Sequence, residues 1–205
     1  MLLLEEHDPF AVEKCVEALK GRGNVLLLPT ETVYGLVCDY EDTAAREAIY
    51  RLKRRDKSKL LGAFLPDLAH LPSRCLLSKK ASLLAEKFMP GPFTLVLPDG
   101  TGGTFGFRIP DHPLLSKILV SSGKILAQTS ANLSGTPPAL SPREALSALE
   151  GEVSLAVDGG RIPADSLSST VVFVEGDFMK ILREGAVPRQ AIEDALQEKE
   201  KNSPR

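Results

Sequence analysis

Cysteine and histidine are scarce in this 205-residue sequence. Its cysteines are an odd number with no C-x-x-C pair, which favours neither a disulfide framework nor a zinc site. The three histidines lie far apart in the chain, and none has a second ligand at the spacing that metal sites use. We therefore expect a protein of the reducing cytoplasm whose thiols fill the core. The cysteines are Cys15, Cys38 and Cys75.

Long apolar runs are missing too. The N-terminal segment MLLLEEHDPF has three leucines followed at once by acids, whereas a signal peptide has a basic start and a longer apolar stretch. No apolar run approaches the roughly 20 residues that span a bilayer. We expect no leader peptide and no membrane association.

Tryptophan is absent, and the sequence has only three tyrosines and a formal net charge of -2. These values argue against a protein whose whole surface binds nucleic acid, although they are compatible with a local basic cleft. An apolar fraction of 43% and a charged fraction of 25% are ordinary for a globular protein, and the length suits a single domain.

Helix and strand patterns alternate along most of the chain. Caps, helical spacing and proline positions predict helices over residues 9–20, 43–52, 78–88, 113–120 and 142–150, and from about residue 188. Short apolar runs predict strands at 26–28, 60–65, 93–97, 107–109, 125–127 and 153–157, with a hairpin at 170–174 and 178–182. We predict one α/β (α+β) domain over residues 1–198, built on a twisted mixed sheet, and a disordered tail at 199–205.

The segment PTETVYGL follows the first predicted strand. Pro29 has no backbone donor and ends this strand, so Thr30, Glu31, Thr32 and Tyr34 leave the sheet together. Ligands of open α/β sheets bind beside strand ends, which makes the segment a candidate binding loop. A polar turn without a binding role is the alternative interpretation of this segment by itself.

The segment RLKRRDKSK carries six cations and a single acid, Asp56. A solvated helix end is the ordinary explanation, since the helix dipole favours cations near a C-terminus. Six cations within nine residues also repel one another unless an anion is near, so a phosphorylated ligand or a nucleic acid is the functional alternative. The cations are Arg51, Lys53, Arg54, Arg55, Lys57 and Lys59.

The segment QTSANLSG follows a buried strand and can also bind a ligand. Ser130 and Asn132 can present a hydroxyl and an amide to the same group, together with backbone N–H donors. Ser130 lacks a G-x-S-x-G elbow and no histidine is an obvious partner, so we do not expect a covalent mechanism.

Two arginines are placed to face a ligand from strand ends. Arg108 lies at the end of a short predicted strand before Pro110, and Arg183 follows the second strand of the hairpin. The glycine-rich segment DGTGGTFG has neither the lysine of a P-loop nor the spacing of a Rossmann turn, so it predicts a plain turn.

Seven segments in the same order resemble motifs of the YrdC-like family, the threonylcarbamoyl-AMP synthases. The resemblance covers roughly residues 25–185. Asp56 stands where the family often has proline, and Phe64 is near a position where many members have histidine. The segments are PTETVYGL, Lys53-Arg54-Arg55 as the K-x-R motif, PGPFTLVLP, FRIP, Ser130-Ala131-Asn132 as the S-x-N motif, SSTVV and ILREG.

This resemblance implies a YrdC-like twisted open sheet with flanking helices and a concave, positively charged cleft. It implies that L-threonine, bicarbonate (or CO2) and ATP, with Mg²⁺, give threonylcarbamoyl-AMP and pyrophosphate. A separate transferase complex would then use the product to modify the adenosine beside the anticodon of certain tRNAs. Cations placed where charge accumulates are the main catalytic device of such phosphoryl chemistry.

The resemblance also implies roles for individual residues. Arg108 is expected to pair with the carboxylate of threonine. No protein side chain is expected to bind a metal. The expected catalytic residues are Lys53, Arg55, Ser130 and Asn132. The expected threonine-binding residues are Thr32, Arg108, Gln128 and Ser169. The expected nucleotide-binding residues are Arg55, Lys59, Thr104, Ser130 and Arg183.

Two other functions are compatible with the same residues. One is a carbamoyltransferase resembling the YrdC-like domain of the hydrogenase maturation protein HypF, which would use carbamoyl phosphate and ATP; the length of this chain argues against it. The other is an RNA-binding module of tRNA or ribosome maturation, against which the net charge and the few stacking aromatics argue. Weak tRNA binding is compatible with the synthase as well.

Overall fold

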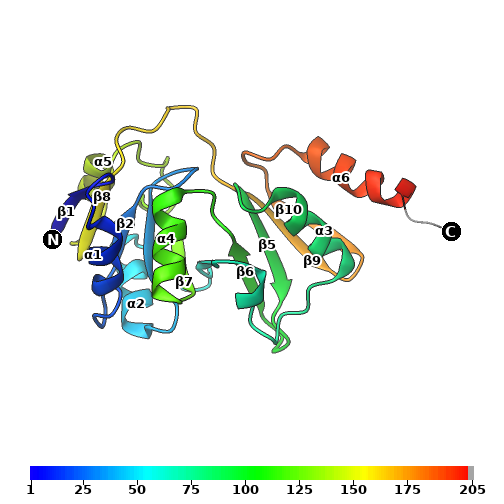
Figure 1. The fold of residues 1–205 in the computed structure, drawn as a ribbon, viewed down its shortest axis with the longest axis horizontal. Helices are drawn as coiled ribbons and strands as arrows, with labels where there is room; N and C mark the ends of the chain where they lie inside the picture. Colours follow the sequence, from blue (N-terminus) through cyan, green and yellow to red (C-terminus); the bar gives the residue numbers. More distant parts are fainter. Residues whose placement is uncertain (203–205) are drawn as a thin grey trace.

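Ten strands form one mixed sheet in the order β1-β8-β2-β3-β7-β4-β6-β5-β9-β10 (Figure 1). The structure, a computed structural model, describes residues 1–202 and, for residues 199–202, the backbone alone. The strands are β1 (Leu2–Glu5), β2 (Leu26–Leu28), β3 (Gly35–Asp39), β4 (Gly62–Phe64), β5 (Phe93–Pro98), β6 (Thr104–Arg108), β7 (Leu126–Ser130), β8 (Leu155–Asp158), β9 (Thr170–Glu175) and β10 (Phe178–Arg183).

Six α-helices and one 3₁₀ helix flank this sheet in the described part of the chain. They are α1 (Ala11–Ala18), α2 (Thr43–Leu52), η1 (Leu68–His70), α3 (Lys79–Phe88), α4 (Pro113–Ser122), α5 (Pro142–Ala148) and α6 (Arg189–Asn202). The sheet contains parallel pairs such as β4/β6 and β5/β9 and antiparallel pairs such as β3/β7 and β5/β6. The predicted class, an α/β domain on an open mixed sheet with flanking helices, is confirmed.

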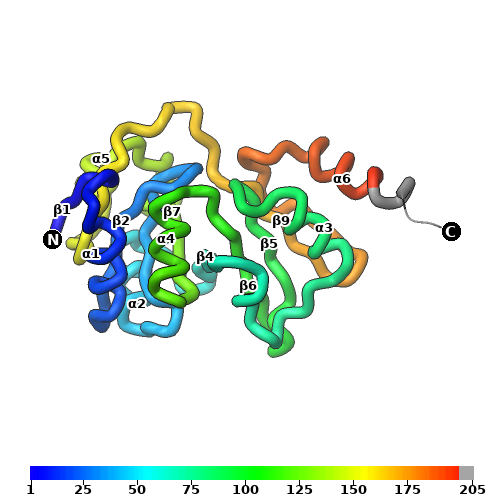
Figure 2. Tube along the Cα trace, in the orientation of Figure 1, coloured from blue at the N-terminus to red at the C-terminus, as the bar shows by residue number. Residues whose placement is uncertain are grey.

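The two halves of the sheet are covered differently. The half from β1 to β7 lies between two layers: α1 and α4 pack on one face, and α2 and α5 pack on the other. On β5, β6 and β9 the core with α3 and α6 forms on one face only. The sheet twists between its halves (Figure 2). The second face of β5, β6 and β9 lines a cavity.

Side-chain caps explain why three of the six predicted helices begin where they do. Asp42 accepts hydrogen bonds from the N–H groups of Ala44 and Ala45, Ser78 accepts one from Ala81, and Ser141 accepts one from Glu144. The first helix was misplaced: Asp8 caps only the N–H of Phe10 (2.8 Å), and α1 begins at Ala11. Asp8-Pro9 therefore forms a turn before the helix.

Two strands have no counterpart in the sequence prediction. β1 is a four-residue edge strand with mostly exposed leucines, and β3 directly continues the PTETVYGL loop. The glycine-rich turn is also shorter than predicted, because β6 already begins at Thr104. Helix α6 includes residues 199–202 of the predicted tail, whereas residues 203–205 lie outside the described residues. Within residues 1–202, no helix is long and apolar enough to cross a membrane.

Candidate functional site

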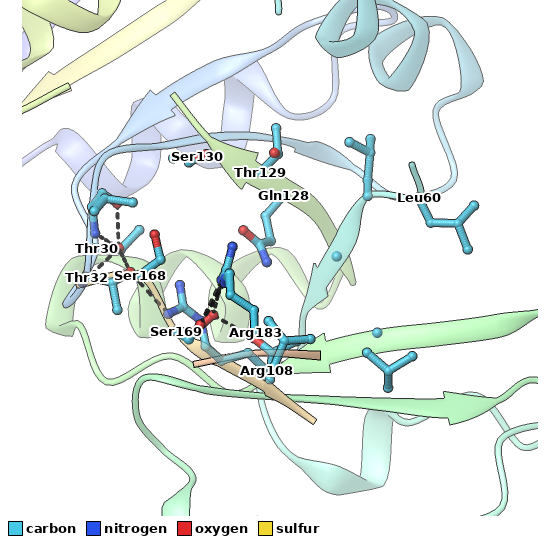
Figure 3. Close-up of a pocket in the computed structure, with 18 of the residues that line it drawn as sticks. Thr30, Thr32, Leu60, Arg108, Gln128, Thr129, Ser130, Ser168, Ser169 and Arg183 are labelled. Atoms are coloured by element: carbon cyan, nitrogen blue, oxygen red, sulfur yellow. Dashed lines mark hydrogen bonds between the residues drawn. The ribbon is translucent and has the colours of Figure 1, made fainter. Parts of the chain in front are cut away.

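A cavity of about 460 Å³ opens in the concavity of the sheet (Figure 3). Its walls come from the loop after β2, the segment between α2 and β4, strands β4, β5, β6, β7 and β9, and the end of β10. Strand ends from distant parts of the chain converge here, as in other open α/β sheets. Eight of the predicted site residues line it, namely Thr32, Arg55, Thr104, Arg108, Gln128, Ser130, Ser169 and Arg183.

The guanidinium groups of Arg55 and Arg183 are held by backbone carbonyls. Arg55 donates from Nε to the carbonyl of Lys59 (3.0 Å) and from Nη2 to that of Leu60 (2.9 Å). Arg183 donates from Nη2 to the carbonyl of Ser169 (2.7 Å) and to its hydroxyl (3.2 Å). Neutral acceptors orient both groups without cancelling their charge.

The cavity arginines lie close enough to repel one another. Burial, followed by the charge of Arg55, lowers the pKa of Arg183 below its ordinary value. Burial also lowers the pKa of Arg108; the charge of Arg183 contributes to this shift, and Glu31 opposes it. A cluster of desolvated like charges favours an anionic ligand, because the ligand relieves the repulsion. The arrangement therefore predicts that the cavity binds anions.

Arg108 is the most deeply buried of the three, with only 3% of its surface exposed. Its Nη1 donates to the Thr32 hydroxyl (3.2 Å), and its guanidinium lies 4.9 Å from the centre of the Phe64 ring. Nη1 is also 3.0 Å from Oε1 of Glu31. Within the described residues, however, neither buried Glu31 oxygen has a hydrogen bond of good geometry. Glu31 therefore balances Arg108 mainly by its charge.

A chain of hydroxyl groups continues from Arg108 into the PTET loop. The Thr30 hydroxyl donates to the Val33 carbonyl (2.7 Å) and lies 2.9 Å from the Thr32 hydroxyl. The Thr30 oxygen also accepts from the N–H groups of Thr32 (3.1 Å) and Val33 (3.2 Å), while the Thr32 hydroxyl accepts from Arg108. The second lone pair of the Thr32 hydroxyl is still available. Thr32 can therefore accept a hydrogen bond from a ligand.

Lys53 lies behind the cavity wall rather than in it, and the catalytic role expected for it stays a prediction. Only 1% of its surface is exposed, and its ammonium donates to the carbonyls of Ser130 and Asn132, the latter at 2.5 Å. Burial, followed by the charge of Arg55, lowers the pKa of Lys53 to about 8. Lys53 thus ties the end of α2 to the S-x-N loop.

The end of α2 explains why Lys53 and Arg55 point to different places. Arg54 has a left-handed backbone (φ 47), its N–H donates to the carbonyl of Arg51, and the N–H of Arg55 donates to that of Tyr50. These two bonds and the left-handed residue between them form a Schellman motif. The chain therefore reverses at Arg54, with Lys53 on the core side and Arg55 on the cavity side.

Two further predicted site residues lie outside the cavity lining. Asn132 is buried, and its amide nitrogen donates to the carbonyls of Leu133 (2.8 Å) and Thr136 (2.7 Å), so it shapes the S-x-N loop. Lys59 is exposed and contributes its carbonyl to Arg55. Arg54 and Lys57 form surface ion pairs with acids. The cations of the predicted basic cluster thus lie in different places: Arg54 and Lys57 are in surface ion pairs, Arg55 lines the cavity and Lys53 is buried.

Several hydroxyl-bearing residues of the cavity were not among the predicted site residues. Thr94 projects from β5, and its hydroxyl lies 2.9 Å from that of Ser169. Successive side chains of a strand point to opposite faces of the sheet. Phe93 and Leu95 are fully buried in the core, so this alternation along PGPFTLVLP could have indicated that Thr94 faces the other side. The others are Thr30, Ser58, Thr129 and Ser168.

Known proteins match this chain over most of its length. The family model described as "Telomere recombination", for Sua5, YciO and YrdC, matches residues 18–185. The threonylcarbamoyl-AMP synthase of Bacillus subtilis is 34% identical over 94% of this chain and 58% of its own length. A crystal structure of Pyrococcus abyssi Sua5 complexed with L-threonine is 27% identical, with a TM-score of 0.82 over 95% of this chain and 60% of that one.

A structure of Escherichia coli YciO is 25% identical, with a TM-score of 0.80 over 93% of this chain and 98% of that chain. This chain therefore spans about three fifths of the B. subtilis and P. abyssi proteins and nearly all of YciO. The fold, the order of the motifs and the matched range agree with one another. The chain belongs to the Sua5/YciO/YrdC family.

Proposed function

We propose that this chain joins L-threonine, bicarbonate (or CO2) and ATP into threonylcarbamoyl-AMP with release of pyrophosphate. One observation carries the proposal: Arg55, Arg108 and Arg183 come from three separate segments and share one cavity. Carbamate, triphosphate and the carboxylate of threonine are all anions. A cavity with three guanidinium groups is suited to binding them side by side.

The names of the relatives support this choice of substrates. The B. subtilis relative is named a threonylcarbamoyl-AMP synthase, and the P. abyssi structure is a complex with L-threonine. Both proteins are longer than this chain, so the activity assigned here is that of the shared domain. The product would pass to a separate transferase complex that modifies tRNA, in the cytoplasm.

The reaction has two steps, the formation of a carbamate and its attack on ATP. The amine of threonine takes up CO2 and loses a proton to give a carbamate, and a carbamate oxygen then attacks the α-phosphorus as the bond to pyrophosphate breaks. We assign Arg55 and Arg183, with the Ser130 hydroxyl, to the phosphate charge that grows in this step. Thr104 would contact the nucleotide.

The amino acid would bind at the hydroxyl-rich end of the cavity. Nη1 of Arg108 already contacts Thr32 and Glu31. A carboxylate would therefore bind the other nitrogen atoms of this guanidinium group. Thr32, which has an acceptor position left, would accept from the amine. Ser169 would complete this end beside Arg183.

Mg²⁺ would enter as the counterion of ATP. Among residues 1–198, whose side chains the structure describes, no three histidine, cysteine, aspartate or glutamate side chains are grouped closely enough to hold a metal ion. The charges that the protein offers to the phosphates are therefore those of the arginines. When bound with ATP, Mg²⁺ would neutralise further phosphate charge.

Pyrophosphate release tests the proposal. Purified protein with MgATP should release pyrophosphate only when both L-threonine and bicarbonate are present, and each should be omitted in turn. Release that does not depend on threonine would exclude the synthase function.

A further inference from the structure

The hydroxyl of Tyr34 holds the chain directly after β8. The Tyr34 ring lies in the core between the sheet and helices α2 and α5, and only 1% of this residue is exposed. Its hydroxyl donates to the Gly160 carbonyl (2.6 Å) and accepts from the Gly159 N–H (3.0 Å). Burial raises the pKa of Tyr34 to about 12, so the hydroxyl keeps its donor proton at neutral pH.

Both residues that this hydroxyl contacts need to be glycine. A Cβ atom at Gly159 would lie 2.8 Å from the Cβ of Pro29, so the chain passes directly against the start of the PTET loop. Gly160 has a left-handed backbone (φ 82), which residues with a side chain rarely adopt. Its N–H donates to the Asp158 carboxylate (2.8 Å). The contact with Tyr34 is therefore built from both sides.

The two glycines begin a strap, residues 159–169, that crosses from β8 in one half of the sheet to β9 in the other (Figure 1). Shortly after the glycines, the Ile162 N–H donates to the Leu140 carbonyl (2.8 Å). Within the described part of the chain, a single hydrogen bond, inside one turn, then involves residues 163–167. The strap is thus anchored at its first end and has little support of its own in the middle.

The far end of the strap lies in the cavity wall. Ser168 and Ser169 line the cavity, and the Ser169 carbonyl accepts from Nη2 of Arg183 (2.7 Å). In Figure 3, Ser168 lies on the same side of the cavity as Thr30 and Thr32 of the PTET loop. The strap and the PTET loop therefore form the hydroxyl-rich end of the cavity together.

We propose that Tyr34 is a positioning residue whose hydroxyl holds the strap where Thr32 and Ser169 can bind the same threonine molecule. This inference rests on the proposed function. Tyr34 lies in the core behind the cavity wall, so it acts through the strap rather than by touching the substrate. Its backbone carbonyl accepts from the Ala131 N–H of the S-x-N loop (2.7 Å). This backbone contact does not need the hydroxyl, so loss of the hydroxyl leaves the phosphate side in place.

Tyr34→Phe removes the hydroxyl and keeps the buried ring. Dissociation constants are measured by calorimetry for L-threonine and for MgATP separately. Threonine should bind about tenfold more weakly, because the strap loses two hydrogen bonds, whereas ATP binding should change less than twofold. Amide hydrogen exchange at residues 159–162 should become faster. Tyr40→Phe is the matched control and should keep both constants, because the Tyr40 ring packs against Phe105 of β6 (centres 5.6 Å apart).

Gly159→Ala tests the same contact from the strap. Its methyl group would meet Pro29 and displace the strap, so threonine should bind more weakly although Tyr34 is intact. The double variant should bind threonine within about twofold of the weaker single variant, since both changes break one contact.

Unchanged threonine binding in Tyr34→Phe, or an equal loss for both ligands, would overturn the inference. So would a lower melting temperature with unchanged dissociation constants, which is the result expected of a purely structural residue. If Tyr34→Phe does not fold, Gly159→Ala decides by the same criteria. A wild type that does not bind threonine would overturn this inference and the proposed function together. The expected binding losses without threonine-dependent pyrophosphate release would contradict the proposed function alone.

Discussion

Replacing Lys53 with methionine tests whether a buried ammonium holds the S-x-N loop. The pKa of Lys53 falls from 10.5 to about 8 on folding, so below pH 8 the buried charge costs about 3 kcal/mol. Methionine removes this cost but leaves the carbonyls of Ser130 and Asn132 without their donor, at about 1–3 kcal/mol each. The two effects nearly cancel, so Lys53→Met should fold. Turnover should nevertheless fall about 100-fold, because the untied loop misplaces Ser130.

The pH dependence of stability separates this explanation from a general loss of packing. Between pH 8 and 10.5 the unfolded chain binds more protons at Lys53 than the folded protein, so stability rises with pH over this window. Urea unfolding at pH 7 to 10.5 should therefore show the wild type gaining about 3 kcal/mol relative to Lys53→Met. Lys59→Met, an exposed lysine of the same segment, should show no such gain. A difference between wild type and Lys53→Met that does not change with pH would refute the reasoning.

Three further substitutions separate the other charges of the site. Arg55→Ala should lower kcat by about 100-fold or more with an unchanged melting temperature, and activity near wild type would remove Arg55 from the phosphate site. Arg54→Gly should stabilise the protein by about 1 kcal/mol in urea unfolding, since glycine tolerates φ 47 and the surface ion pair with Glu150 contributes little. Glu31→Gln should lower the free energy of unfolding by about 3 kcal/mol, because Arg108 keeps its charge without a buried partner. A loss below about 1 kcal/mol, measured by the same method, would show that this pair is unimportant.

Most helices could be predicted because the residues that start a helix lie next to it in the sequence. Asp42, Ser78 and Ser141 each cap a helix within three residues of themselves. β1 escaped prediction because its stability comes from β8, which is distant in the chain, whereas β3 pairs with the preceding strand β2 as well as with the distant β7. A short edge strand with exposed leucines has little pattern of its own.

The sequence predicted which segments form the candidate site but not how their side chains come together in space. Each strand-end arginine by itself has the sequence signature of a surface residue, and only the order of the motifs indicated that they share a cleft. The burial of Lys53 could not be predicted, because the carbonyls that bind it lie 77 and 79 residues further along the chain. Exposed and buried lysines have the same local sequence pattern.

The K-x-R motif nevertheless has a local cause that its sequence contains. A Schellman motif requires one left-handed residue after the helix, and Arg54 occupies that position. The reversal there sends the residue before it towards the core and the residue after it towards the cavity. The spacing of one residue between Lys53 and Arg55 is therefore what separates a loop-positioning lysine from a cavity arginine. It follows that the side chain at position 54 matters little to the site, whereas an added residue between Lys53 and Arg55 would abolish their division of roles.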